Sequence, residues 1–280
     1  MTTREARLPG GTIEYQDAGA GPVVVLVHGA HTNASVWDQV AGDLRADHRC
    51  VVPTLPLGGH RLPVPAAADL SPPGVAGLLG ELLEALDLDE VTLVGNDTGG
   101  ALAQLLVTRD PSRIARLVLA SCDAFENFPP GLPGRVSALA GRVPGGMAMA
   151  GQLMRWNVLA RLPLTWGWMA KRPIPREMLD AWFAPLRAQR GVRRDAARFM
   201  RAVDRRDLLS AAGKLPSFSR PALIVWAAED LVMPRGHAER LADLLPDARI
   251  VMVSDTYTLI TLDQPLRLAA LVREFVKEER

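Results

Sequence analysis

The feature that most constrains the fold is an alternation of short apolar runs with segments of helical periodicity. Residues 23–27 and 114–121 are almost continuously apolar, as expected for strands of a parallel sheet that is covered on both faces. Helical periodicity runs between them, over residues 71–86 and 99–108. The alternation resumes at residues 221–227 after a long interruption. This order predicts an α/β fold with a doubly wound, mostly parallel sheet.

The interruption covers residues 125–215. It shows helical periodicity broken by prolines, including Pro144 and Pro163, and it contains no convincing strand. A helical segment inserted late in an α/β sheet predicts a lid above a core. We therefore expect an α/β core formed by residues 1–124 and 216–280, with a helical lid of residues 125–215 inserted in it.

The strongest local motif is the run VGNDTGG at residues 94–100, which has the form of a nucleophile elbow with Asp97 at its centre. Small residues on either side permit a tight turn from strand to helix. Such a turn places the central side chain at the carboxyl edge of the sheet, beside a helix N-terminus. Taken alone, the motif also fits a simple helix cap formed by Asn96 and Asp97.

The context of the motif favours the elbow. His28, Gly29 and Ala30 follow the apolar run 23–27, at the place where an oxyanion hole is built. With these residues, the elbow, the late helical segment and the run VWAAED at 225–230, the chain resembles the α/β-hydrolase superfamily over nearly its whole length. Its aspartate elbow is similar to the haloalkane dehalogenase and epoxide hydrolase branch.

This resemblance implies roles for several residues. Asp97 would be the nucleophile and Asp230 the supporting acid, while the backbone amides of Ala30 and Thr98 would form the anion-binding hole. Asp123, just after the run 114–121, matches an alternative acid position of some dehalogenases. No cofactor and no metal are implied.

The chain departs from the family at the catalytic histidine. The signature that follows this histidine is present as residues 263–265, DQP, but residues 254–262 contain no histidine and Thr258 aligns with its place. His31, in the loop expected above the site, is the candidate replacement base. We expect His28 to pin its own loop, and His237 to lie at the surface of a helix.

The missing histidine leaves three functions open. The first is a hydrolase-superfamily enzyme that acts on a small, mainly apolar molecule, with Asp97 as nucleophile or general base and Asp230 in support. An ester formed on Asp97 would need an activated water for its hydrolysis. The second is therefore a non-hydrolytic lyase, isomerase or cyclase of secondary metabolism on the same scaffold, and the third a catalytically silent ligand-binding protein.

The markers of the two named branches are also absent. Thr98 stands where these dehalogenases usually carry a tryptophan, and the two tyrosines, Tyr15 and Tyr257, fall outside the helical segment. For the wall of a substrate pocket we expect Trp166 and Met169, which lie in that segment near proline breaks, and we add Tyr257 as a further substrate-binding candidate.

Composition limits the partners. A net charge of +1 and the lack of a recognition motif predict no nucleic-acid partner and no membrane partner. The helical segment is basic and the remainder acidic, which we attribute to a solvated face paired with the core, with an anionic substrate group as the alternative. Two cysteines without metal-ligand spacing, and no leader-like N-terminus, predict a cytoplasmic protein. Whether the chain forms a homodimer is left open by the sequence.

Overall fold

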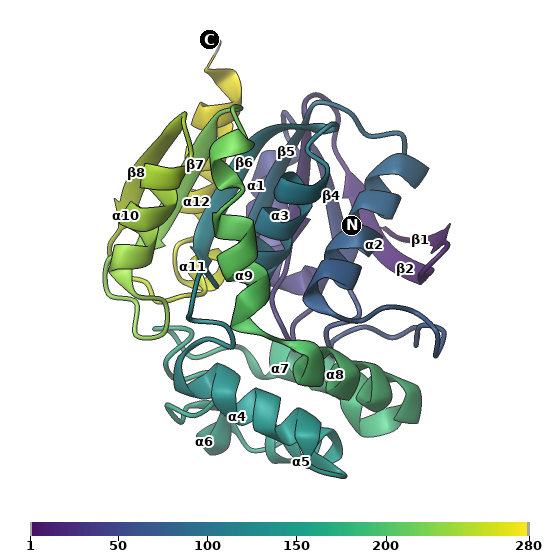
Figure 1. The fold of residues 1–280 in the computed structure, drawn as a ribbon. Coiled ribbons are helices and arrows are strands. Elements are labelled where there is room, and N and C mark those ends of the chain that lie inside the picture. The colour runs from purple at the N-terminus through teal and green to yellow at the C-terminus, as the bar shows by residue number, and fades with distance from the viewer. Residues whose placement is uncertain (1, 279–280) are drawn as a thin grey trace.

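A computed structural model describes residues 2–278 and shows one eight-stranded sheet among them (Figure 1). The order across the sheet is β1-β2-β4-β3-β5-β6-β7-β8; β2 pairs antiparallel with β1 and β4, and the other pairs are parallel. The expected doubly wound, mostly parallel sheet is confirmed. Its strands are β1 (Thr3–Leu8), β2 (Gly11–Ala18), β3 (Val23–Val27), β4 (Arg49–Thr54), β5 (Val91–Asp97), β6 (Ile114–Cys122), β7 (Ala222–Ala227) and β8 (Ala248–Val253).

Helices cover both faces of this sheet (Figure 1). On one face lie α1 (Asp38–Leu44) and α12 (Pro265–Lys277), with the short η1 (Ala34–Trp37) and α11 (Ile260–Asp263) beside them. On the other face lie α2 (Pro72–Ala85), α3 (Thr98–Arg109), α9 (Arg205–Ala212) and α10 (Arg235–Leu244). The side chains of β3 from Val24 to Val27 are fully buried between these layers, which explains why that strand is apolar throughout.

A block of helices lies beyond the carboxyl ends of the strands, at the bottom of Figure 1. We call it the helical block; it consists of α4 (Gly131–Arg142), α5 (Gly146–Leu153), α6 (Asn157–Ala160), α7 (Arg176–Ala188) and α8 (Arg190–Ala202). In sequence it stands between β6 and β7. The chain then returns through α9, which packs against α3, and through η2 (Leu215–Ser217). No helix within residues 2–278 is both long and apolar enough to cross a bilayer.

Two local details fix the start of α2 and the position of α3 against the sheet. The hydroxyl of Ser71 accepts a hydrogen bond from the amide of Gly74, which caps α2 at its expected start. At Gly99, a Cβ atom would lie 2.1 Å from the carbonyl oxygen of Val27, so only glycine lets α3 lie this close to β3. The close approach holds the first turn of α3 directly beside the end of β3.

The first strand was not expected from the sequence. Residues 3–8 are rich in charge, but they pair antiparallel with β2 from Thr3–Gln16 to Leu8–Gly11. Only Ala6 and Leu8 of this strand are buried. An edge strand with one face in solvent needs few apolar residues, which is why its composition gave no signal.

Candidate active site

Asp97 lies at the junction of β5 and α3. Its backbone has φ 55° and ψ −132°, a conformation that L-residues with a side chain rarely adopt. A Cβ at Gly95 would lie 2.4 Å from the carbonyl oxygen of Gly99, so the turn needs glycine beside it. The strained turn raises the Asp97 side chain at the carboxyl edge of the sheet, as a nucleophile elbow does.

The Asp97 carboxylate is held by backbone amides. The N–H groups of Thr98 and Ala30 donate hydrogen bonds to it. The carboxylate also lies against Gly29, where a Cβ would be 1.9 Å from Asp97 Oδ2. The residue is only 4% exposed, and this burial raises the pKa of Asp97 to about 7, with a further rise from the charge of Asp230 and an opposing effect of the two amides. Near neutral pH the carboxyl group therefore exists in both protonation states.

Thr258 lies between Asp230 and the elbow. Its hydroxyl donates to Asp230 Oδ1 over 2.8 Å, and its carbonyl oxygen accepts a hydrogen bond of 2.8 Å from the side-chain amide of Asn96. The side chain of Thr258 is fully buried. Asp230 Oδ1 also accepts the amides of Val232 and Met233, and burial raises the pKa of this carboxyl group. The position that the sequence aligns with a histidine thus belongs to the hydrogen-bond network of the candidate acid.

Asp123 is a third buried carboxyl group close to the elbow. Its Oδ2 accepts a hydrogen bond of 2.9 Å from the hydroxyl of Thr98, while Oδ1 is buried and has no hydrogen-bond partner among residues 2–278. Burial, followed by the charge of Asp97, raises the pKa of Asp123 well above its usual range. A neutral carboxylic acid at Asp123 is therefore the favoured form, because a second buried negative charge beside Asp97 would be unfavourable.

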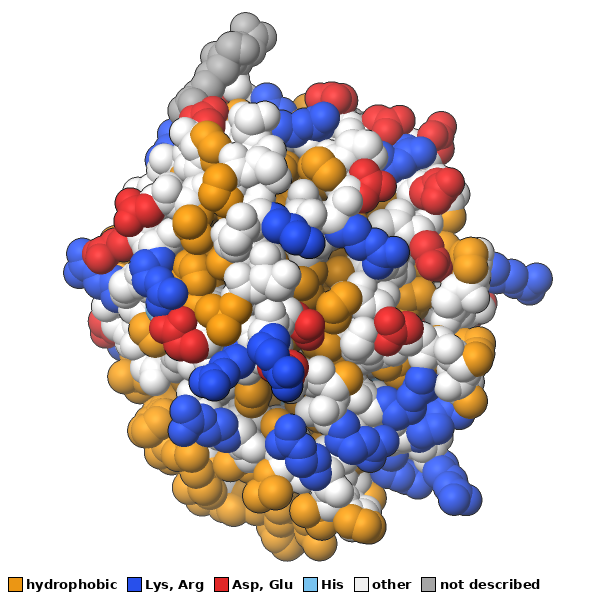
Figure 2. Space-filling model, in the orientation of Figure 1, with side chains coloured by type: hydrophobic (Ala, Val, Ile, Leu, Met, Phe, Trp, Pro, Cys, Tyr) orange, Lys and Arg blue, Asp and Glu red, His pale blue; other side chains and the backbone are white. Residues whose placement is uncertain are grey.

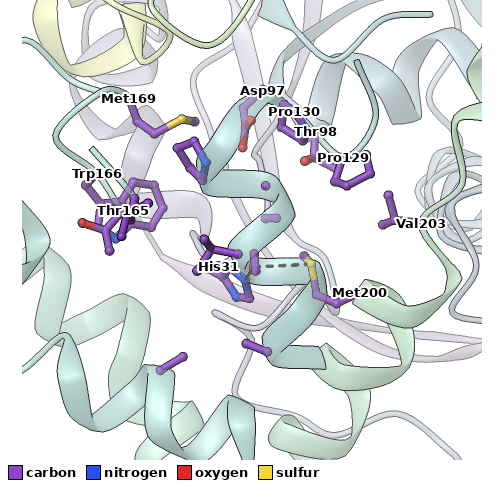
Figure 3. A pocket seen from close by; sticks show the side chains of 18 of the residues that line it. His31, Asp97, Thr98, Pro129, Pro130, Thr165, Trp166, Met169, Met200 and Val203 are labelled. Carbon is purple, nitrogen blue, oxygen red and sulfur yellow. Dashed lines mark hydrogen bonds between the residues drawn. The ribbon is translucent and has the colours of Figure 1, made fainter. Parts of the chain in front are cut away.

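An apolar cavity of about 130 Å³ opens above Asp97. In Figure 3, Trp166 and Met169 lie on one side of this cavity, Met200 and Val203 lie on the other, and Asp97 lies between them. Most of the wall comes from the helical block. The lining residues include Ala30, His31, Asp97, Thr98, Phe128, Val136, Ser137, Ala140, Met154, Leu164, Thr165, Trp166, Met169, Phe183, Phe199, Met200 and Val203.

The cavity brings together some of the candidate residues and not others. Ala30, Thr98, Trp166 and Met169 line it with Asp97, while Asp123 and Asp230 are not among the residues that line it. Tyr257 is not at the cavity. Its amide donates to Asp263, and the ammonium group of Lys171 lies 6.0 Å from the centre of its ring, so the side chain belongs to a surface cluster instead.

His31 faces the cavity from the loop after β3, with φ 59°. Its Nε2 is hydrogen-bonded to the hydroxyl of Ser137 on α4, and its ring stacks on Phe183 with centroids 6.2 Å apart. Burial lowers the pKa of His31 to about 4, so the ring is neutral at pH 7 and its protonated form is disfavoured. Sequence analysis missed Ser137, because α4 is brought to this place by the tertiary fold and carries no motif.

The other histidines have structural partners. His28 is fully buried; its Nε2 accepts the amide of Leu55 over 2.9 Å, which pins the loop as expected. His237, expected at the surface, is buried on α10 with its ring against Phe125, so that expectation is wrong. The helical pattern placed His237 correctly on α10, but it could not show that the loop after β6 covers this face. Within residues 2–278 no group of three histidine, cysteine or acidic side chains is placed to hold a metal ion.

Comparison with known proteins identifies the family to which the chain belongs. Residues 24–271 match a family model described as "Alpha/beta hydrolase family". The chain is 26% identical to a cis-3-alkyl-4-alkyloxetan-2-one decarboxylase of Shewanella oneidensis, over 96% of this chain and 86% of that protein. It is 25% identical to haloalkane dehalogenase 2 of Mycobacterium tuberculosis, over 94% of this chain and 91% of that protein.

The fold also matches solved structures. The epoxide hydrolase CorEH superposes with a TM-score of 0.81 at 19% identity, covering 98% of both chains. At this level of identity the match extends to the fold alone.

Proposed function

Because the chain belongs to the alpha/beta hydrolase family, we propose that it is an enzyme in which Asp97 attacks an electrophilic carbon of a small, mainly apolar molecule. The observation that carries the proposal is the placement of Asp97. Its carboxylate is buried at the end of an apolar cavity, on a strained turn, and is oriented by the amides of Ala30 and Thr98. A desolvated and oriented carboxylate is an effective nucleophile.

The chemistry of the first step is a displacement. One oxygen of the Asp97 carboxylate forms a bond to the substrate carbon, while the bond from that carbon to its leaving group breaks. The leaving group takes the electron pair, as a halide from a haloalkane or as the ring oxygen of an epoxide, which is then protonated from solvent. The product is an alkyl ester of Asp97, and the amides of Ala30 and Thr98 can hold its free oxygen.

The second step is where Thr258 matters. Hydrolysis of the ester needs a base that activates water, and the hydroxyl of Thr258, which is bound to Asp230, cannot serve as one. We assign Asp230 a supporting role through hydrogen bonding, since it accepts a hydrogen bond from the hydroxyl of Thr258, whose carbonyl oxygen is bound by Asn96 beside Asp97. His31 is the candidate base that lines the cavity, and with its pKa lowered to about 4 it would be a weak one. Without such help the ester is long-lived.

Intact-protein mass spectrometry tests this proposal. The protein is incubated separately with 1-bromoalkanes and with terminal epoxides, in parallel with the isosteric variant Asp97→Asn. We expect a stable mass gain in the wild type only, equal to the alkyl group less one hydrogen for a bromoalkane and to the whole molecule for an epoxide, and peptide mapping should assign it to Asp97. No adduct and no turnover would overturn the covalent proposal and leave Asp97 as a general base or a ligand-binding group.

A second candidate is a lyase reaction that consumes no water. Thr258 in place of a histidine favours it, and one relative is named for decarboxylating an oxetan-2-one. Asp97 would attack C4, the saturated ring carbon bonded to the ring oxygen. The C4–O bond would break, which opens the lactone and frees its carboxylate. Loss of CO₂ would then form a carbon–carbon double bond and expel Asp97 unchanged. The substrate becomes an alkene and CO₂, and no activated water is required.

Product analysis distinguishes the two candidates. Incubation with a cis-3,4-dialkyloxetan-2-one should give the alkene, detected by gas chromatography with mass spectrometry, with no persistent adduct and no product from Asp97→Asn. If the lactone is recovered unchanged while haloalkanes label Asp97, the lyase candidate is excluded. Tight binding of substrates that are all recovered unchanged would instead indicate a ligand-binding protein.

A further inference from the structure

Exposed apolar side chains gather on one part of the helical block. Of the fourteen large hydrophobic residues that are exposed among residues 2–278, ten lie between positions 132 and 164. Figure 2 shows them at the lower end of the molecule, over α4, α5 and α6. We call this surface the apolar tip; its residues are Leu132, Val136, Leu139, Val143, Met149, Leu153, Trp156, Val158, Leu162 and Leu164. An apolar surface of this extent on a folded protein indicates an interaction site.

Helix α4 shows how the apolar tip is built. Its small residues Ala138 and Gly141 are buried against the rest of the protein. The opposite face is exposed and mixes two kinds of residue at helical spacing. These are Leu132, Arg135, Val136, Leu139, Arg142 and Val143. Leucine, valine and arginine along one exposed helix face are typical of helices that lie at a lipid–water interface.

The charge of this region has one sign. Residues 127–176 contain seven basic residues and no aspartate or glutamate. Arg135, Arg142, Arg155 and Arg161 are exposed, and within the described part of the chain their guanidinium groups form no ion pair. Figure 2 shows Lys and Arg side chains beside the apolar tip, while the acidic side chains lie higher in the view. The whole-chain charge of +1, which predicted no membrane partner, conceals this local excess.

The apolar tip is continuous with the cavity. Val136 and Leu164 are 38% and 44% exposed, and both also line the cavity above Asp97. Apolar surface therefore extends from the outside of the helical block to the candidate nucleophile.

From these observations we propose that the apolar tip docks on an anionic lipid surface. The apolar side chains enter the interface, and the unpaired arginines bind lipid phosphates. A second copy of the chain fits less well, because a face-to-face dimer would bring eight like charges together without an acid to pair them. Docking is independent of the reaction at Asp97; only the route of the substrate from lipid into the cavity rests on the proposed function.

Vesicle flotation of the purified 280-residue chain tests the proposal. The vesicles are phosphatidylcholine alone, or phosphatidylcholine mixed with phosphatidylglycerol. We expect the protein to float with the mixed vesicles, and binding to fall as salt is raised. The double variant Arg135→Gln/Arg142→Gln should weaken partition roughly 30-fold, since each basic group near such a surface contributes on the order of 1 kcal/mol. The double variant Leu139→Gln/Trp156→Gln should also weaken it, because it removes two apolar side chains that would enter the interface.

The controls separate docking from folding and from catalysis. Leu266→Gln/Arg267→Gln removes an exposed apolar side chain and an exposed arginine on α12 and should float like the wild type. Asp97→Asn should also float normally, so a failure of the proposed reaction leaves this test intact. Absence of flotation, or equal loss in the α12 control, would overturn the proposal. Self-association in the absence of lipid, if Leu139→Gln/Trp156→Gln abolishes it, would also overturn the proposal, because the apolar tip would then be a dimer interface.

Discussion

At the scale of single residues, the proposed covalent reaction at Asp97 makes a specific prediction for Thr258. Its hydroxyl contacts Asp230 over 2.8 Å and its backbone is held by Asn96, beside the elbow. An imidazole at this position would have Asp230 as its hydrogen-bond partner. We expect Thr258→His to speed hydrolysis of an alkyl ester on Asp97 by about 10²-fold or more, the usual contribution of a general base.

The measurement is the decay of the adduct mass after excess haloalkane has been removed. Thr258→Asn, which adds a polar side chain without a base, is the matched control. Because Thr258 is fully buried, circular dichroism and thermal melting must first show that both variants fold. An adduct that decays equally slowly in Thr258→His and in the control would mean that water does not reach the ester.

A second prediction concerns the protonation of Asp97. Only the carboxylate is a nucleophile, and burial raises its pKa to about 7. The rate of adduct formation should therefore rise with pH, level off above about 7, and fall about tenfold for each pH unit well below it. Asp230→Asn removes a neighbouring negative charge and should move the midpoint to lower pH. Labelling rates across a pH series measure both effects; a rate independent of pH around neutrality would contradict them.

At the scale of elements, the contact between β3 and α3 depends on one glycine. A Cβ at Gly99 would lie 2.1 Å from the carbonyl oxygen of Val27 and 2.8 Å from that of His28. These are backbone atoms at the base of the elbow, so moving them to make room would cost free energy. We expect Gly99→Ala to lower the free energy of unfolding by about 3 kcal/mol and to slow adduct formation.

Denaturant unfolding, followed by circular dichroism, measures the stability. Gly42→Ala is the matched control: Gly42 lies in α1 with no atom within 4 Å of its added Cβ. There the same change should stabilise the protein by about 0.5–1 kcal/mol, because alanine is the better helix former. If Gly99→Ala were as stable as the wild type, the close approach would not be what holds α3 in place.

The elements of the core could be predicted because their signals are local. Apolar runs such as β3, and the cap at Ser71, can be recognised from residues that are adjacent in the sequence. The edge strand β1 was missed because a strand with one solvated face and six residues has little apolar content. The two local motifs likewise indicated residues that meet: Asp97 and Thr98 lie at the junction of β5 and α3, and Ala30 lies in the loop after β3.

What could not be predicted depends on contacts distant in sequence. Ser137 reaches His31 only because α4 is carried over the sheet edge. Tyr257 was expected near the substrate from its place in the sequence, but Asp263 and Lys171 hold it elsewhere. The local charge of the helical block was visible in the sequence, yet its exposure on one face of α4 required the structure.

At the scale of the whole molecule, the cavity exists only while the helical block is attached to the core. Several hydrogen bonds fasten it, among them one from α7 and one from α8. The indole N–H of Trp182 on α7 donates to the hydroxyl of Ser35 over 2.9 Å. On α8, the fully buried Asp195 accepts the amide of Val64 over 2.9 Å and pairs with Arg194. The second contact ties α8 to the loop that follows β4, beside the cavity wall formed by Phe199 and Met200.

We therefore expect Asp195→Ala to promote local unfolding of the helical block and to leave the stability of the sheet unchanged. The change leaves the amide of Val64 without its acceptor and removes the carboxylate that pairs with Arg194 and His60, which should cost about 3 kcal/mol. Amide hydrogen exchange should speed up in α8 and in the loop around Val64, while β5 and β6 keep the protection of the wild type. Asp180→Ala, which removes partly exposed ion pairs within the same block, should change exchange very little. Equal acceleration in β5 would mean that block and core unfold as one unit, and the block could not open for substrate without unfolding the elbow.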